Sequence, residues 1–83
     1  MATYSTKDID QASCLGTVCG IFPVVLRDGY DGQAIFEFDH TPEIQAALID
    51  FASGTTTTNA RRLLATRRRL FHEVRIVTAR GRI

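Results

Sequence analysis

The chain has no tryptophan, only one lysine and no long apolar segment. Its longest apolar run, Ile21 to Leu26, contains Pro23 and is far shorter than the roughly 20 residues of a membrane-spanning helix. The sequence also lacks the apolar stretch and cleavage site of a secretory signal. These absences predict a cytoplasmic protein with no membrane partner.

Cysteine is scarce as well. Cys14 and Cys19 are five positions apart within one predicted helix, where their side chains point in different directions and a disulfide between them would be strained. No further ligands stand nearby at metal-binding spacing. We expect two small buried residues in a reducing compartment, and no cofactor.

Recognisable catalytic patterns are missing too. The chain shows no nucleophile–base pair, no metal-ligand cluster and no glycine-rich phosphate loop, so we expect no enzyme and no catalytic residue. His40 is predicted to lie in a loop. The acids around the predicted hairpin do not fit a calcium loop, because the alternation of ligands fails at Tyr30. We interpret them as turn residues and a solvated strand face; they are Asp28, Asp31, Glu37 and Asp39.

What the chain does contain predicts a small single domain over residues 1–83. The fold class is α+β, in the order helix, β-hairpin, helix, long helix, with helices covering a two-stranded sheet. A core of this size supplies only about 3–5 kcal/mol, so self-association would add useful burial. The predicted helices span residues 6–19, 42–52 and 59–74, and the predicted strands span residues 21–27 and 33–39.

Local signals carry these boundaries. The Ser5-Thr6-Lys7-Asp8 segment resembles a capping box, after a lead-in of residues 1–4. Two Asp-Gly pairs predict the hairpin turn. Thr41-Pro42 opens the middle helix. Gly16, inside the first helix, predicts close approach of another backbone.

Hydrophobic periodicity predicts the buried positions. Phe36 and Phe38 alternate with Glu37, which places the two rings on the inner face of their strand. The full inward set is Ile9, Leu15, Phe36, Phe38, Leu48, Phe51, Leu63, Leu64 and Phe71.

The segment 59–74 is the most strongly patterned part of the chain. At about 100° per residue, one face of this helix is apolar and the other is basic. The apolar stripe contains Ala60, Leu63, Leu64, Leu70, Phe71 and Val74. The basic side contains Arg61, Arg62, Arg68, Arg69, His72 and Arg75. Residues 75–83 either continue the helix, extend as a strand or form a loose arginine-containing tail.

Charge is divided unevenly along the chain. Residues 1–54 contain eight acids and two basic residues, whereas residues 55–83 contain eight arginines, no lysine and only Glu73. The division favours either an anionic partner for the basic part or pairing between the two parts. Arginine recognises phosphate and carboxylate through planar, bidentate contacts, although a coding bias would produce the same preference.

Two features of the long helix break local rules. Arg61 and Arg62 stand in its first turn, where the helix dipole disfavours cations. With Thr58 and Asn59 they form a candidate anion site. The alternative is that these two arginines pair with acids; the nearest candidates are Asp50, Glu37 and Asp39.

Arg67 interrupts the apolar stripe. Its stem could lie along the core while its head reaches solvent, it could meet a carboxylate, or the stripe could be completed by another chain. We therefore mark Arg67 as a candidate interface residue of a homodimer.

A resemblance follows from several of these motifs. Residues 4–73, with the Ser5-Thr6-Lys7-Asp8 opening, the Phe36-Glu37-Phe38 strand, the helix from Pro42 and the Asn59–Leu64 segment, resemble a family of small uncharacterised bacterial and phage proteins. The resemblance implies a phage or mobile-element setting. It carries over no catalytic or binding residue.

Two functional hypotheses remain. The first is a nucleic-acid-binding module, for DNA or RNA, whose phosphate contacts are Arg61, Arg62, Arg68, Arg69 and Arg75. The second is a protein-interaction module, an inhibitor or accessory subunit, whose acidic and basic parts dock to itself or to a partner protein.

Overall fold

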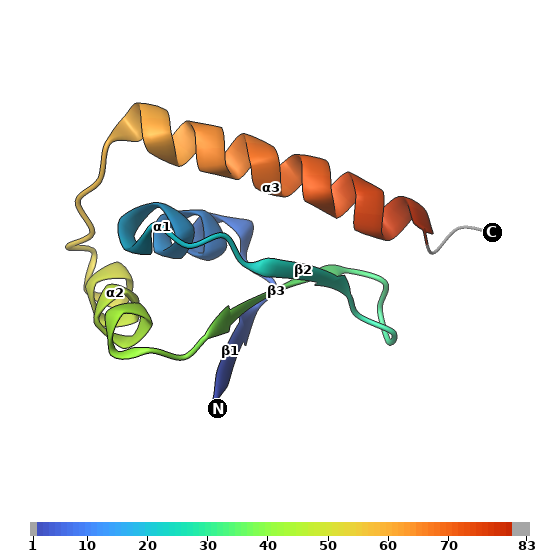
Figure 1. Cartoon of the computed structure of the whole chain (residues 1–83), viewed down its shortest axis with the longest axis horizontal. Coiled ribbons are helices and arrows are strands. Elements are labelled where there is room, and N and C mark those ends of the chain that lie inside the picture. The colour runs from blue at the N-terminus through green and yellow to red at the C-terminus, as the bar shows by residue number, and fades with distance from the viewer. Residues whose placement is uncertain (1, 81–83) are drawn as a thin grey trace.

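The computed structural model describes residues 2–80, as three helices and a three-stranded antiparallel sheet. Figure 1 shows α3 running along one side of the molecule, with α1 and β2 packed beneath it and α2 packed on α1. The α+β class and the predicted order of helix, hairpin, helix and long helix are confirmed. The elements are β1 (Thr3–Thr6), α1 (Ile9–Cys19), β2 (Val24–Arg27), β3 (Ala34–Asp39), α2 (Pro42–Ser53) and α3 (Ala60–Arg80).

The N-terminal segment differs from the prediction. Residues 3–6 form β1 rather than a lead-in and the start of a helix, and β1 pairs with β3 from Thr3↔Asp39 to Thr6↔Phe36. The cap of α1 is Asp8, whose carboxylate accepts hydrogen bonds from the backbone N–H groups of Asp10 and Gln11. The sheet therefore has the order β1-β3-β2 instead of two strands.

The predicted sheet register is confirmed. Phe36 and Phe38 are buried, with 1% and 3% of their surface exposed, while Glu37 between them is only half-buried. β3 is the central strand of the sheet. Phe36 and Phe38 on its inner face belong to the core cluster that the helices complete. The buried apolar core joins β3 to all three helices through Ala12, Leu15, Phe36, Phe38, Ile44, Ala47 and Leu70.

Gly16 allows a close approach inside α1, as its position predicted. A Cβ built there would lie 2.9 Å from the carbonyl oxygen of Ile21 and 3.5 Å from Cγ2 of Thr66 on α3. A side chain at this position would push the Ile21 carbonyl away from α1, whereas Thr66 lies at ordinary contact distance.

The boundaries of α2 follow the local signals. The Thr41 hydroxyl accepts a hydrogen bond from the N–H of Ile44, and Pro42 occupies the first turn. Gly54 ends the helix in the left-handed conformation, at φ 72°. The middle helix is therefore one residue longer than predicted.

α3 is longer than predicted and turns a different side to the core. It continues to Arg80, so residues 75–80 are helical and not a loose tail; residues 81–83 of that predicted tail lie outside the described part. Leu70 is fully buried and Leu63 is half-buried. Leu64 and Phe71 are 58% and 40% exposed, so their predicted inward placement is wrong.

The reason is the position of α1 and β2 beneath α3. The covered side is centred on Leu70 and includes Thr66 and Val77, each partly buried. The apolar stripe read from the sequence is wider than this contact, and one edge of it is left in solvent. None of the helices formed by residues 2–80 is both long enough and apolar enough to cross a lipid bilayer.

Candidate nucleic-acid interface

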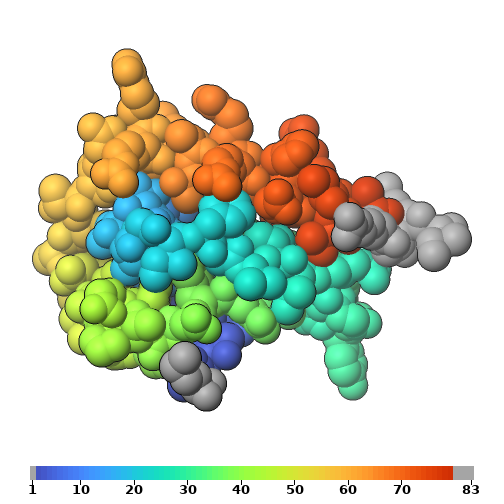
Figure 2. Space-filling view, viewed as in Figure 1, coloured from blue at the N-terminus to red at the C-terminus, as the bar shows by residue number. Residues whose placement is uncertain are grey.

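Three arginines lie along the side of α3 that faces away from the core. Arg61, Arg68 and Arg75 are exposed and seven residues apart, so they repeat about every two turns, or roughly 10.5 Å. We call them the outer row. Figure 2 shows side chains in the first half of α3, orange in the colour bar, projecting away from the molecule.

The other two predicted arginines lie on a different side. Arg62 and Arg69 line a depression against the end of α1, together with Gly20 and Phe22. The Arg69 guanidinium stands over the Phe22 ring, 4.2 Å from its centroid, a cation–π contact. The five predicted phosphate contacts are therefore divided between the outer row and this second pair.

The described residues contain no ion pair between the arginines of either group and an acid of residues 2–54. The salt bridges found within residues 2–80 join Lys7 to Asp28 and Asp31, and Arg67 to Asp10. Pairing of Arg61 or Arg62 with Asp50, Glu37 or Asp39 is thus not observed in the described part of the chain.

The hairpin turn accounts for two of the acids. Lys7 Nζ lies 2.7 Å from Asp28 Oδ2 and 2.6 Å from Asp31 Oδ2. The Lys7 ammonium lowers the pKa of both carboxyls, and the carboxylates raise the pKa of Lys7. Each carboxylate also accepts a backbone N–H two residues on, from Tyr30 and Gln33. These contacts are those of a turn, as the sequence indicated.

Arg67 meets a carboxylate of its own chain. Its Nε donates a hydrogen bond to Asp10 Oδ1 at 3.0 Å, across 57 positions of sequence. Its guanidinium carbon also lies 4.8 Å from the centroid of the Phe71 ring. Of the three alternatives for Arg67, this geometry supports pairing with a carboxylate; its predicted role at a homodimer interface stays a prediction.

At the predicted anion site, Asn59 caps α3. Its side-chain oxygen accepts the backbone N–H of Arg62 at 3.1 Å, which occupies one of the free donors of the first turn. Thr58 is half-buried, and the side chains of Arg61 and Arg62 are exposed. Anion binding here stays a prediction.

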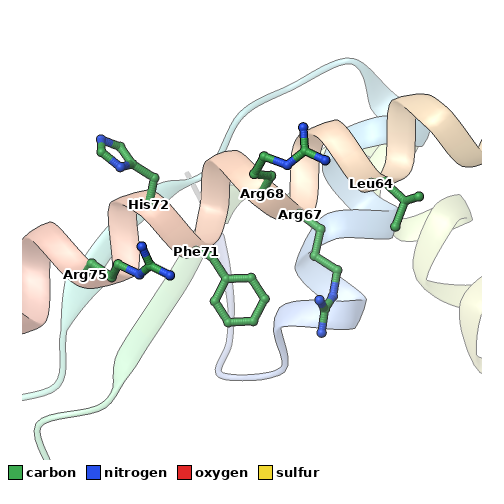
Figure 3. A pocket seen from close by; sticks show the side chains of 6 residues that line it. All are labelled: Leu64, Arg67, Arg68, Phe71, His72 and Arg75. Atoms are coloured by element: carbon green, nitrogen blue, oxygen red, sulfur yellow. The ribbon is translucent and has the colours of Figure 1, made fainter.

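A shallow groove of about 530 Å³ lies along the exposed edge of α3. Figure 3 shows Arg67 and Phe71 extending to one side of the helix, with Arg68 and His72 on the other side and Arg75 between them. Sequence reasoning placed Leu64 and Phe71 in the core and so missed this groove. Its lining residues are Leu64, Arg67, Arg68, Phe71, His72 and Arg75.

The two cysteines are unbridged and half-buried. Burial is the main cause that raises the pKa of each thiol, with nearby acids adding to it. The prediction of two buried residues is therefore met only in part, since Cys19 packs against the core but both side chains are partly exposed.

Comparison of the chain with protein-family models, curated protein sequences and solved structures found no match. The resemblance to small bacterial and phage proteins therefore stays a prediction.

Proposed function

We propose that this protein is a small nucleic-acid-binding module that holds phosphates with α3. The observation that carries the proposal is the outer row: Arg61, Arg68 and Arg75 are exposed, point away from the core and form no ion pair with the described acids. Fixed positive charge without an internal partner is available to an external anion.

The chemistry of arginine supports phosphate as that anion. A guanidinium presents planar donors that match two phosphate oxygens at once and keeps its charge at every physiological pH. Three such groups along one rigid helix can follow a phosphate backbone without reading base sequence. Two of the acids of the N-terminal part, Asp28 and Asp31, are already paired with Lys7.

Binding measured against salt concentration tests the proposal. For duplex DNA, a plot of the logarithm of the association constant against the logarithm of the salt concentration should have a slope of about −0.9 per phosphate contact. The double variant Arg68→Ala, Arg75→Ala should weaken binding to all sequences alike and flatten that slope by about 2.

The chain offers a control of equal charge. The double variant Arg62→Ala, Arg69→Ala also removes two positive charges, but from the side that faces Phe22. It should change the slope less than loss of Arg68 and Arg75. Absence of any binding of the wild-type protein to nucleic acid at about 50 mM salt would contradict the proposal.

A second candidate is a protein-interaction module, favoured by the exposed apolar side chains of Leu64 and Phe71. The basic helix would then dock on an acidic partner, or on the acidic N-terminal part of a second copy. Sedimentation equilibrium tests self-association: a dimer at high micromolar concentration supports it, and a monomer removes it.

The cellular setting is part of the same proposal. The unbridged, half-buried thiols of Cys14 and Cys19 suit the cytoplasm, and the resemblance described above suits a phage or mobile element.

A further inference from the structure

Phe71 stands in an unusual position for an aromatic residue. The residue is 40% exposed on the edge of α3, although the core beside it is built from apolar side chains. Burying a side chain of this size is worth about 1.5–3 kcal/mol, so part of that stabilisation is not realised. Phe71 lines the groove together with two members of the outer row, Arg68 and Arg75.

Arginines surround this ring on its own helix. Arg68 precedes Phe71 by three residues and Arg75 follows it by four, the two spacings that bring side chains together on a helix surface. Arg67, four residues before, holds its guanidinium carbon 4.8 Å from the ring centroid, and its Nε donates a hydrogen bond to Asp10. One arginine, Arg67, therefore stands over the ring, and two exposed arginines, Arg68 and Arg75, line the same groove.

We infer that the groove binds single-stranded nucleic acid, with one base stacked on Phe71 and the adjoining phosphates held by Arg68 and Arg75. This inference rests on the proposed function and names its ligand. A positively charged groove with an aromatic platform is the usual arrangement of single-strand-binding surfaces. A duplex keeps its base faces stacked inside, so it can use the arginines but not the ring.

An acidic protein helix fits the groove less well. The apolar stripe of such a helix would need a continuous apolar surface to pack against. The groove offers only two apolar side chains, Leu64 and Phe71, and Arg67 lies between them in the sequence. A single strand offers a planar apolar base and a phosphate at every nucleotide. That alternation matches a ring flanked by guanidinium groups.

The absence of tryptophan from the chain permits a direct experiment. The Phe71→Trp variant places one fluorophore at the proposed stacking position, where a stacked base should quench it. Titration with oligo-dT, oligo-U, a duplex of equal length and poly-glutamate, all at about 50 mM salt, should give quenching with the single strands. The duplex and the acidic polymer should leave the emission unchanged. The dT and U arms show whether DNA or RNA is preferred.

A second variant measures the contribution of the ring. Phe71→Leu keeps an apolar side chain at an exposed position and removes the aromatic face. It should weaken single-strand binding by about 5- to 100-fold, as expected for the loss of one stacked base, and leave duplex binding unchanged. Phe71→Tyr should bind like the wild type, and circular dichroism should show the same helix content in all three variants.

The outcomes separate the inference from the function on which it rests. Salt-dependent binding that is equally strong for single strand and duplex, with no effect of Phe71→Leu, overturns stacking and leaves phosphate binding intact. No binding to any nucleic acid overturns both. Quenching by poly-glutamate without quenching by oligonucleotides overturns both in favour of an acidic protein partner.

Discussion

The inner and outer surfaces of α3 use similar residue types in different ways. On the inner surface Leu70 is fully buried, Arg67 pairs with Asp10 and Arg69 lies over Phe22. On the outer surface the outer row forms no ion pair within the described residues, and Leu64 and Phe71 are 58% and 40% exposed. The inner surface therefore maintains the fold, and the outer surface is free to bind. Substitutions that distinguish stability from binding can test this division.

The largest expected effect is on the inner surface. Leu70→Ala should lower the free energy of unfolding by about 2–5 kcal/mol, because it leaves a cavity among fully buried side chains. Leu64→Ala removes the same atoms from a side chain that is 58% exposed, and should stay within about 0.5 kcal/mol of the wild type. Urea denaturation of both variants measures the difference. Equal losses would show that the two surfaces are not distinct.

The next effect concerns the closest contact beneath α3. Gly16→Ala should destabilise the protein by about 1–3 kcal/mol, since the added Cβ would lie 2.9 Å from the Ile21 carbonyl oxygen. Gly29→Ala is the control, because a Cβ there meets no atom within 4 Å. Thermal unfolding followed by circular dichroism compares the two. A stabilised Gly16→Ala would mean that helix propensity outweighs the clash.

A smaller effect is expected for the ion pair. The side chains of Arg67 and Asp10 are 40% and 68% exposed, so their coupling energy should be only about 0–1 kcal/mol. A double-mutant cycle with Arg67→Ala and Asp10→Ala measures it. The coupling should weaken as salt is raised. A coupling energy that does not change with salt concentration would mean that the ion pair is shielded from solvent more than its exposure indicates.

The smallest effect is expected on the outer surface. Arg68→Ala combined with Arg75→Ala should change the free energy of unfolding by no more than about 0.5 kcal/mol, although the same variant is expected to impair nucleic-acid binding. Chemical denaturation checks this. A clear loss of stability would assign these arginines to the fold and contradict their proposed role.

Elements with strong local signals could be predicted from the sequence. The start of the α2 helix followed from Thr41-Pro42, since capping depends on neighbouring residues only. The strand β3 followed from alternation. In contrast, β1 was missed. Residues Thr3–Thr6 form a strand because they pair with β3, which lies some 30 positions further along the chain. Local capping rules could not show that partner.

The candidate site was predictable in part for the same reason. Exposure of the outer row followed from helical periodicity. The partners of Arg67 and Arg69 did not, because Asp10 and Phe22 belong to segments far away in sequence. Periodicity predicts the apolar face of a helix, but it does not show which part of that face other elements cover. For this reason Leu64 and Phe71 were placed in the core.

The position of Leu70 in the core has a consequence for how the chain matures. Within the described residues, β1 precedes the other elements, whereas Leu70 is supplied by α3, which follows them. While the polypeptide is being synthesised, the cluster around Phe36 and Leu15 lacks this last side chain until α3 has emerged. The nascent chain should therefore expose an unfinished apolar surface for as long as α3 has not emerged, and α3 should cover it.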